Sequence, residues 1–259
     1  MSDLVGQTLD HYTIEAKVGE GTIGRVYRAH DQQNQRTVAL KIINANYAQN
    51  EGFRQQFLLD MRLRSSLSHR NLVRIYEPGN AGGVLYLATE FINGENLRDY
   101  LVTYEQKLTF LPLMEVTILV KQIAEGLHYL HDQGLAHLAL KPANIHLREN
   151  PPDVSERAVL SDIGMRSLFL SVRSSEILSF EQSLAYVSPE ICTGQTGDAL
   201  SDIYALGVVM YRLAVGKLPF TPKDFQQAIE MHTRHPVPLP MTERPGLPVE
   251  LQRIILQAL

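Results

Sequence analysis

The chain has 259 residues, of which 44% are hydrophobic, so it can form one large domain or two smaller lobes. A net charge of -4 gives no reason to expect nucleic acid or an anionic membrane as the main partner. The single cysteine, Cys192, excludes a disulfide within the chain. The sequence has no apolar run long enough for a transmembrane helix and no signal-peptide features at its start, so we expect a cytoplasmic domain or the cytoplasmic part of a longer protein.

The first third of the chain is predicted to be rich in strands. Apolar and polar residues alternate over 12–18, which indicates a half-buried strand, and two more strands are expected over 25–30 and 37–43. The first turn is rich in glycine and reads G-x-G-x-x-G-x-V, with Gly19, Gly21, Gly24 and Val26. Such a turn can be a flexible hairpin, a dinucleotide-binding turn or a phosphate-binding hairpin. A dinucleotide fold needs a helix directly after the glycines, and the β-prone residues 25–27 argue against it.

A helix is expected over 53–67 and an apolar strand over 84–89. After Gly94 the composition changes from strand-like to helical, which places a boundary there. Apolar residues recur at helical spacing over 116–130 and predict a buried helix that ends near Gly134. His128 and His131 lie on this helix and could form a metal pair, but no cluster of cysteines or carboxylates accompanies them, so ordinary histidines are expected. A last helix begins near Pro248.

Three further motifs follow the glycine turn in a fixed order. Residues 38–41 read V-A-L-K, residues 137–144 read H-L-A-L-K-P-A-N, and residues 161–164 read S-D-I-G. This order strongly resembles protein kinases, whose motifs are V-A-I-K, H-R-D-L-K-x-x-N and D-F-G. The resemblance extends over about residues 12–259 and is greatest to bacterial serine/threonine kinases of eukaryotic type. It implies an α+β fold with a small antiparallel N-lobe and one regulatory helix (1–92), followed by a mostly helical C-lobe (93–259).

The resemblance also implies a site for ATP and Mg²⁺. In kinases the glycines and the strand lysine hold the phosphates, backbone groups after the apolar strand bind the adenine, and an Asn and an Asp bind the metal. A lysine in the loop neutralises the transferring phosphoryl group. The residues at these positions are Gly19, Gly21, Gly24, Val26, Ala39, Lys41, Asp60, Thr89, Glu90, Ile92, Lys141, Asn144, His146 and Asp162.

Several positions depart from the kinase pattern. Ala139 stands where the Asp that accepts the substrate proton would be, and an alanine side chain has no acceptor. Asp60, which would pair with Lys41, is one methylene shorter than the usual Glu. His146 replaces the apolar floor of the adenine pocket. Arg64 replaces an apolar residue that would stack with Ile75, His137 and Ile163.

A charge at Arg64 is not expected to be buried unpaired. We therefore predict an outward or loosened position for the regulatory helix. The alternative is that the register is shifted by one residue, so that Leu63 packs instead.

Residues 165–183 correspond to the activation segment. Leu138 replaces the Arg that pairs with a phosphate there, so no switching by that route is predicted. Asp202 is expected to hold the backbone of the catalytic loop. The Arg that pairs with Glu190 in relatives is absent, so either Glu190 has another partner or the chain is a fragment that ends before the last helix, and a fragment is expected.

These observations predict a pseudokinase that binds ATP and Mg²⁺ and acts as a regulatory or scaffolding module on a protein partner, such as an active kinase. Two alternatives are open. The domain could be a weakly active serine/threonine kinase that uses Lys41, Lys141, Asn144 and Asp162. It could also be a scaffold that binds no nucleotide, which His146 and Arg64 favour.

Overall fold

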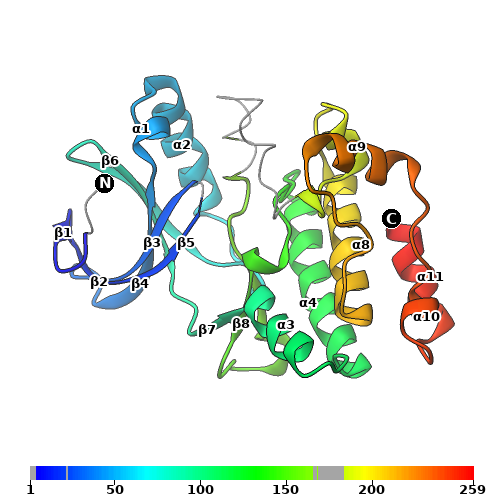
Figure 1. Ribbon diagram of the computed structural model, residues 1–259. Helices are drawn as coiled ribbons and strands as arrows, with labels where there is room; N and C mark the ends of the chain where they lie inside the picture. Colours follow the sequence, from blue (N-terminus) through cyan, green and yellow to red (C-terminus); the bar gives the residue numbers. More distant parts are fainter. Residues whose placement is uncertain (1–3, 22, 166–167, 169–183) are drawn as a thin grey trace. The chain divides into compact units, whose positions relative to one another are not determined.

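The computed structural model describes residues 4–21, 23–165, 168 and 184–259 (Figure 1). The chain divides into two compact units, Met1–Asn93 and Gly94–Leu259. Among the helices in the described ranges, none combines the length and apolar character needed to cross a membrane.

The first unit is built on a six-stranded antiparallel sheet with the strand order β1-β2-β3-β4-β6-β5. The strands expected from the alternation of residues are confirmed in β2, β3, β4 and β6, with small differences at their ends. The strand bounds are β1 (Thr8–Leu9), β2 (Tyr12–Glu20), β3 (Gly24–Asp31), β4 (Arg36–Ile43), β5 (Ile75–Ala81) and β6 (Val84–Glu90).

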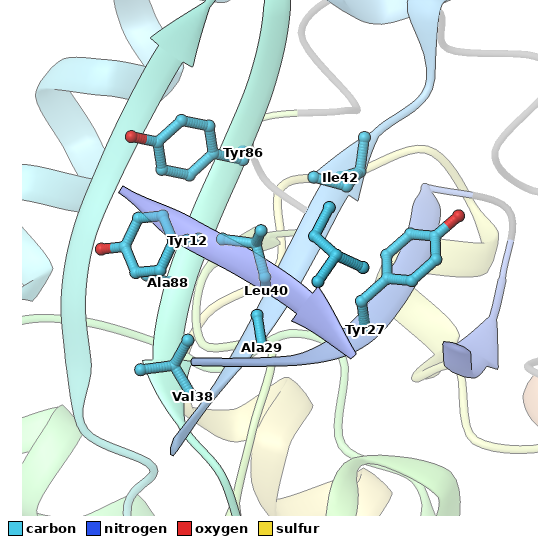
Figure 2. Close-up of a cluster of buried hydrophobic side chains, with 9 residues drawn as sticks. Tyr12, Tyr27, Ala29, Val38, Leu40, Ile42, Tyr86 and Ala88 are labelled. Atoms are coloured by element: carbon cyan, nitrogen blue, oxygen red, sulfur yellow. The ribbon is translucent and has the colours of Figure 1, made fainter. Parts of the chain in front are cut away.

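One face of this sheet carries a buried apolar cluster (Figure 2). Along β4, Val38, Leu40 and Ile42 belong to the cluster and are almost completely buried. Because side chains alternate between the two faces of a strand, Ala39 and Lys41 lie on the opposite face. Val38 and Leu40 of the V-A-L-K motif thus pack into the core, and Ala39 and Lys41 lie on the other face of β4.

Strand β5 was not expected from the sequence, because Pro78 and Gly79 read as strand breakers. Proline is tolerated here because β5 is an edge strand of the sheet. Gly79 also lies against an aromatic ring, since a Cβ atom at this position would be 2.1 Å from Cζ of Tyr86.

Helix α2 (Glu51–Arg64) follows the short helix α1 (Ala45–Ala48). Its start is capped by Asn50, whose side chain accepts a hydrogen bond from the backbone N–H of Phe53 at 2.9 Å. The buried face consists of Phe53, Phe57 and Met61, which are spaced one turn apart. The predicted helix is confirmed, although it begins and ends earlier than expected. Leu63 is 66% exposed, so the shifted register in which it packs is wrong.

The second unit combines a three-stranded antiparallel sheet with helices, and α8 packs against both α4 and α11 (Figure 1). The predicted buried helix is α4, and the helix expected after Pro248 is α11. The bounds are β7 (Gly94–Asn96), α3 (Leu97–Gln106), α4 (Leu113–Asp132), η1 (Pro142–Asn144), β8 (Ile145–Arg148), η2 (Val154–Glu156), β9 (Ala158–Leu160), α7 (Pro189–Cys192), α8 (Ala199–Val215), α9 (Phe225–Arg234), α10 (Pro240–Glu243) and α11 (Val249–Ala258).

Helix α8 begins and ends with defined caps. Asp198 and Ser201 form a capping box at its start, in which each side chain bonds the backbone of the other residue. Gly216 ends the helix in the left-handed conformation, with φ of 79°. These caps fix the position of Asp202 in the first turn of the helix.

Candidate functional site

The sheet of the first unit brings several predicted nucleotide-binding residues into neighbouring positions. Val26 in β3 pairs with Gly19 in β2 and with Lys41 in β4. Ala39 pairs with Thr89 in β6, and the Thr89 hydroxyl lies 3.5 Å from the Ala39 carbonyl oxygen. These residues, which are far apart in the sequence, therefore form a continuous part of the sheet.

The glycine-rich turn closes tightly between β2 and β3. The backbone N–H of Gly21 donates to the carbonyl of Gly24 at 2.9 Å. A Cβ atom on Gly24 would lie 1.9 Å from the carbonyl oxygen of Ile42 in the next strand, whereas a Cβ atom on Gly21 would have no described atom within 4 Å. The packing of the sheet itself therefore requires a glycine at position 24. Gly21 has open space around it, as expected of a glycine that lets phosphate approach the backbone.

The predicted adenine-binding segment follows β6. The backbone N–H of Glu90 donates to the carbonyl of Arg74 at 2.8 Å, which ties the end of β6 to the residue that precedes β5. Ile92 is buried, with 9% of its surface exposed. The adenine-binding role of the Glu90 and Ile92 backbone stays a prediction.

Asp60 and Arg64 lie one turn apart on α2. The Asp60 carboxylate accepts a hydrogen bond from the Gln56 side chain at 2.7 Å. Burial lowers the pKa of the Arg64 guanidinium, and the nearby Asp60 carboxylate opposes this shift. Within the described residues, Nε of Arg64 is buried without a hydrogen-bond partner. Because the charge of Arg64 lies near the Asp60 carboxylate, the expectation that it would not be buried unpaired is not contradicted. The outward position of the helix stays a prediction.

In the second unit, the buried carboxylate of Asp202 holds the loop that precedes η1. Its two oxygens accept hydrogen bonds from the backbone N–H groups of His137 and Leu138, both at 2.7 Å. The predicted scaffold role of Asp202 is confirmed. One of the same oxygens lies 2.9 Å from Nε2 of His131, so this histidine has a structural contact with Asp202.

His128 lies on the surface, with Nε2 3.4 Å from the carboxylate of Asp132. Across the described ranges, no group of three or more His, Cys, Asp or Glu side chains could hold a metal ion. The interpretation of His128 and His131 as ordinary histidines agrees with these contacts.

The loop keeps an ordered backbone around Ala139. The side-chain amide of Asn144 donates to the Ala139 carbonyl at 2.8 Å, and the Ala139 N–H donates to Nδ1 of His137 at 3.2 Å. Burial lowers the pKa of His137, which keeps the imidazole neutral and able to accept this bond. The geometry of the loop is retained although the residue at its centre has no carboxylate.

Two oxygen donors of this unit are linked through the backbone. The amide nitrogen of Asn144 is used by Ala139, so its Oδ1 atom is the one that can bind a cation. The N–H of Ser161 donates to the Asn144 carbonyl at 2.9 Å, which connects Asn144 to the segment that carries Asp162. An amide oxygen and a carboxylate are hard ligands, and this donor set fits Mg²⁺. The N–H of Asn144 also donates to the Lys141 carbonyl at 2.9 Å.

His146 lies in the middle of the three-stranded sheet, paired with Asn96 and Val159. Its Nε2 atom is 3.0 Å from the hydroxyl oxygen of Ser161. Sequence reasoning assigned no role to Ser161, although the structure places its hydroxyl in contact with His146. Its position directly before Asp162 is the signal that could have identified it.

Leu138 has the left-handed backbone conformation, with φ of 58°. Its side chain packs against an apolar cluster that includes Leu184, Val187 and Ile191. Leu138, at the position of the arginine in the kinase motif, thus makes an apolar contact. The loss of phosphorylation switching stays a prediction, since residues 166–167 and 169–183 lie outside the described residues.

Glu190 has a partner within this chain. The Ser201 hydroxyl donates a hydrogen bond to its carboxylate. Burial alone would raise the pKa of Glu190, but hydrogen bonds from Ser201, from Ser188 and from the backbone of Glu190 itself together outweigh burial and lower the pKa. Glu190 thus has another partner in Ser201, and the expectation that the chain is a fragment stays a prediction.

Comparisons with known proteins agree with this geometry. The model of the protein kinase domain matches residues 12–251. The serine/threonine-protein kinase PknJ of Mycobacterium tuberculosis is 29% identical over 256 residues, which cover 98% of this chain and 42% of PknJ. PrkC of Bacillus subtilis is also 29% identical, over 98% of this chain and 38% of PrkC. The chain therefore spans about two fifths of the length of these curated relatives.

The fold is also found among solved structures. A variant of the PknI kinase domain of Mycobacterium tuberculosis matches with a TM-score of 0.75 and 25% identity, over 100% of this chain and 90% of that one. The antiparallel sheet of the first unit and the helices of the second confirm the predicted fold class. The chain belongs to the protein kinase domain family and is related to bacterial serine/threonine kinases.

Proposed function

We propose that this kinase domain is a pseudokinase that binds ATP and Mg²⁺ in the cytoplasm and regulates or scaffolds a protein partner, such as an active kinase. The observation that supports this best is the loop at Ala139. Its backbone is held by Asp202 and Asn144 as in a formed site, but it carries no group that can accept the substrate proton.

The remaining residues support nucleotide binding. Lys41 in β4 pairs with Val26 in β3, and Val26 pairs with Gly19 in β2. The ammonium group of Lys41 would therefore contact the phosphates beside the glycine turn. Asn144 and Asp162 would hold the metal ion, which neutralises the phosphate charge when bound. The domain would then respond to nucleotide through its stability and its surface.

A weakly active kinase is the second candidate, and the retained Lys141, Asn144 and Asp162 favour it. A positioned base contributes about 10²–10⁴ to the rate. Kinases turn over at about 1–100 s⁻¹, so loss of the base alone leaves about 10⁻⁴ to 1 s⁻¹. The shorter carboxylate at Asp60 and the charge at Arg64 lower this rate further.

Thermal denaturation with MgATP tests the proposal, with Mg²⁺ alone and with ATP in EDTA for comparison. At a ligand concentration of about 100 times Kd, binding to the folded state adds about 2.7 kcal/mol of stability. We expect a shift that depends on Mg²⁺ in the wild type and is lost in Lys41→Ala. Lys121→Ala is the matched control, because the Lys121 side chain is 75% exposed on α4. Equal responses of the wild type and Lys41→Ala would rule out nucleotide binding at this site.

A further inference from the structure

A chain of hydrogen bonds runs from the middle of β8 to the predicted metal-binding loop. Nε2 of His146 lies 3.0 Å from Oγ of Ser161. The Ser161 hydroxyl donates to the carbonyl of Asn144 at 3.3 Å, and the Ser161 N–H donates to the same carbonyl at 2.9 Å. All three residues belong to the second unit.

The direction of this chain follows from the inventory of donors. The Asn144 carbonyl can only accept, and the Ser161 hydroxyl has a single proton to donate. Both contacts are hydrogen bonds only if Ser161 donates to Asn144 and accepts from His146. Nε2 of His146 then carries a proton, and the chain of hydrogen bonds runs from His146 through Ser161 to Asn144.

The Ser161 hydroxyl bonds one predicted metal ligand, Asn144, and the other, Asp162, is the next residue in the sequence. Ser161 is the residue directly before Asp162, which has the left-handed conformation with φ of 62°. The backbone carbonyl of Asn144 accepts hydrogen bonds from the hydroxyl and the N–H of Ser161. The side-chain nitrogen of Asn144 donates to the Ala139 carbonyl. Residues that orient metal ligands typically change metal affinity by about 10–100-fold when they are removed.

The His146 side chain, which joins this chain of hydrogen bonds, lies on the half-exposed face of β8. Its neighbours Ile145 and Leu147 are buried, and because side chains alternate along a strand they lie on the opposite face. An apolar side chain at position 146 could fill the same face, but it could not donate to Ser161.

We propose that His146 is a positioning residue that acts through Ser161 on the metal-binding loop, so that a nucleotide base lying against the imidazole and a metal ion at Asn144 and Asp162 bind cooperatively. This inference rests on the proposed nucleotide binding. Because coupling between two ligands is reciprocal, the metal must also increase the affinity for the base.

Isothermal titration calorimetry measures this coupling directly. For each variant, the Mg²⁺ enhancement is defined as the Kd of ATP in EDTA divided by the Kd of ATP in excess Mg²⁺. Adenosine is titrated under the same two conditions. We expect Ser161→Ala and His146→Leu each to lower the Mg²⁺ enhancement of ATP binding about tenfold. Mg²⁺ should tighten adenosine binding in the wild type and not in these variants.

The double variant distinguishes coupling from a local effect on the pocket. If both residues act through one chain, the double variant loses no more Mg²⁺ enhancement than either single variant. Ser66→Ala and His128→Leu are matched controls, because the Ser66 hydroxyl donates to the nearby carbonyl of Leu63 on α2 and the His128 side chain is 76% exposed. Both should keep the wild-type enhancement.

Three results would overturn the inference, and they differ in what they say of the proposed function. A wild type that binds ATP, with the same Mg²⁺ enhancement in Ser161→Ala and His146→Leu, contradicts the coupling alone. Additive losses in the double variant do so as well. A wild type with no ATP binding in either condition contradicts both proposals. Denaturation midpoints without ligand show which variants are folded.

Discussion

The backbone N–H of Leu138 donates a hydrogen bond of 2.7 Å to the carboxylate of Asp202, across 64 residues of sequence. The second carboxylate oxygen accepts the N–H of His137 and also lies 2.9 Å from Nε2 of His131. Asp202 is completely buried. Helix α8 therefore holds the loop that contains Ala139 through the carboxylate of Asp202.

Replacing Asp202 by Asn should destabilise the second unit. The amide keeps one acceptor oxygen but turns an NH₂ group toward a backbone N–H, and the charge that strengthens these bonds is lost. We expect the free energy of unfolding in urea to fall by about 2–3 kcal/mol. The exposed Asp132→Asn change on α4 should have little effect, and equal midpoints for the two variants would refute the scaffold role.

Restoring the missing carboxylate separates a pseudokinase from a weak kinase. Ala139→Asp should raise radiolabelled phosphate transfer from ATP to a protein substrate by about 10²–10⁴, if the other groups are in place. Adding Leu138→Arg should raise it further, although this change removes an apolar contact with Leu184 and Val187. Ser66→Ala serves as the unrelated control. A wild-type rate that equals that of Ala139→Asp would show that this domain needs no base at position 139.

Arg64 should lower the stability of the first unit. Among the residues that the structure describes, its Nε group is buried without a hydrogen-bond partner, and such an unsatisfied donor costs about 1–3 kcal/mol. Arg64→Leu should therefore raise the free energy of unfolding by about 1 kcal/mol or more. Arg62→Leu is the matched control on the exposed face of α2 and should change it little. A loss of stability in Arg64→Leu would show that the guanidinium is well solvated or paired.

The buried His232 should make stability depend on pH. Its Nδ1 lies 2.5 Å from the Tyr204 hydroxyl and its Nε2 lies 2.9 Å from the carbonyl of Leu184. The carbonyl can only accept, so Nε2 carries the proton and Nδ1 accepts from Tyr204. Burial lowers the pKa of His232 in the folded state.

The unfolded chain then takes up the proton first as the pH falls. The contribution of His232 is fully present above the unfolded pKa of about 6.5, and it is lost as the pH falls from there toward the lower folded pKa. Each such group changes stability by at most about 1.4 kcal/mol per pH unit. His232→Gln should flatten the loss of urea stability between about pH 7.5 and 5.5, whereas His128→Gln should not. His137, which is also buried with a lowered pKa, contributes to the slope that is left.

Much of the fold could be read from local patterns. The alternation in β2 and β4 and the helical spacing in α4 are strong because one face of each element is buried. Strand β5 was missed because Pro78 and Gly79 break the pattern, and only its edge position in the sheet makes them acceptable.

The sequence by itself determined the kinase family, the order of its motifs and the absence of a carboxylate at Ala139, because these are matters of residue identity and spacing. Only the tertiary structure decided that Gly24 is required by the Ile42 carbonyl, that Ser201 is a partner of Glu190, and that His146 bonds Ser161. These contacts join residues from different strands and helices. Their distances depend on how the elements pack, which no local pattern along the chain encodes.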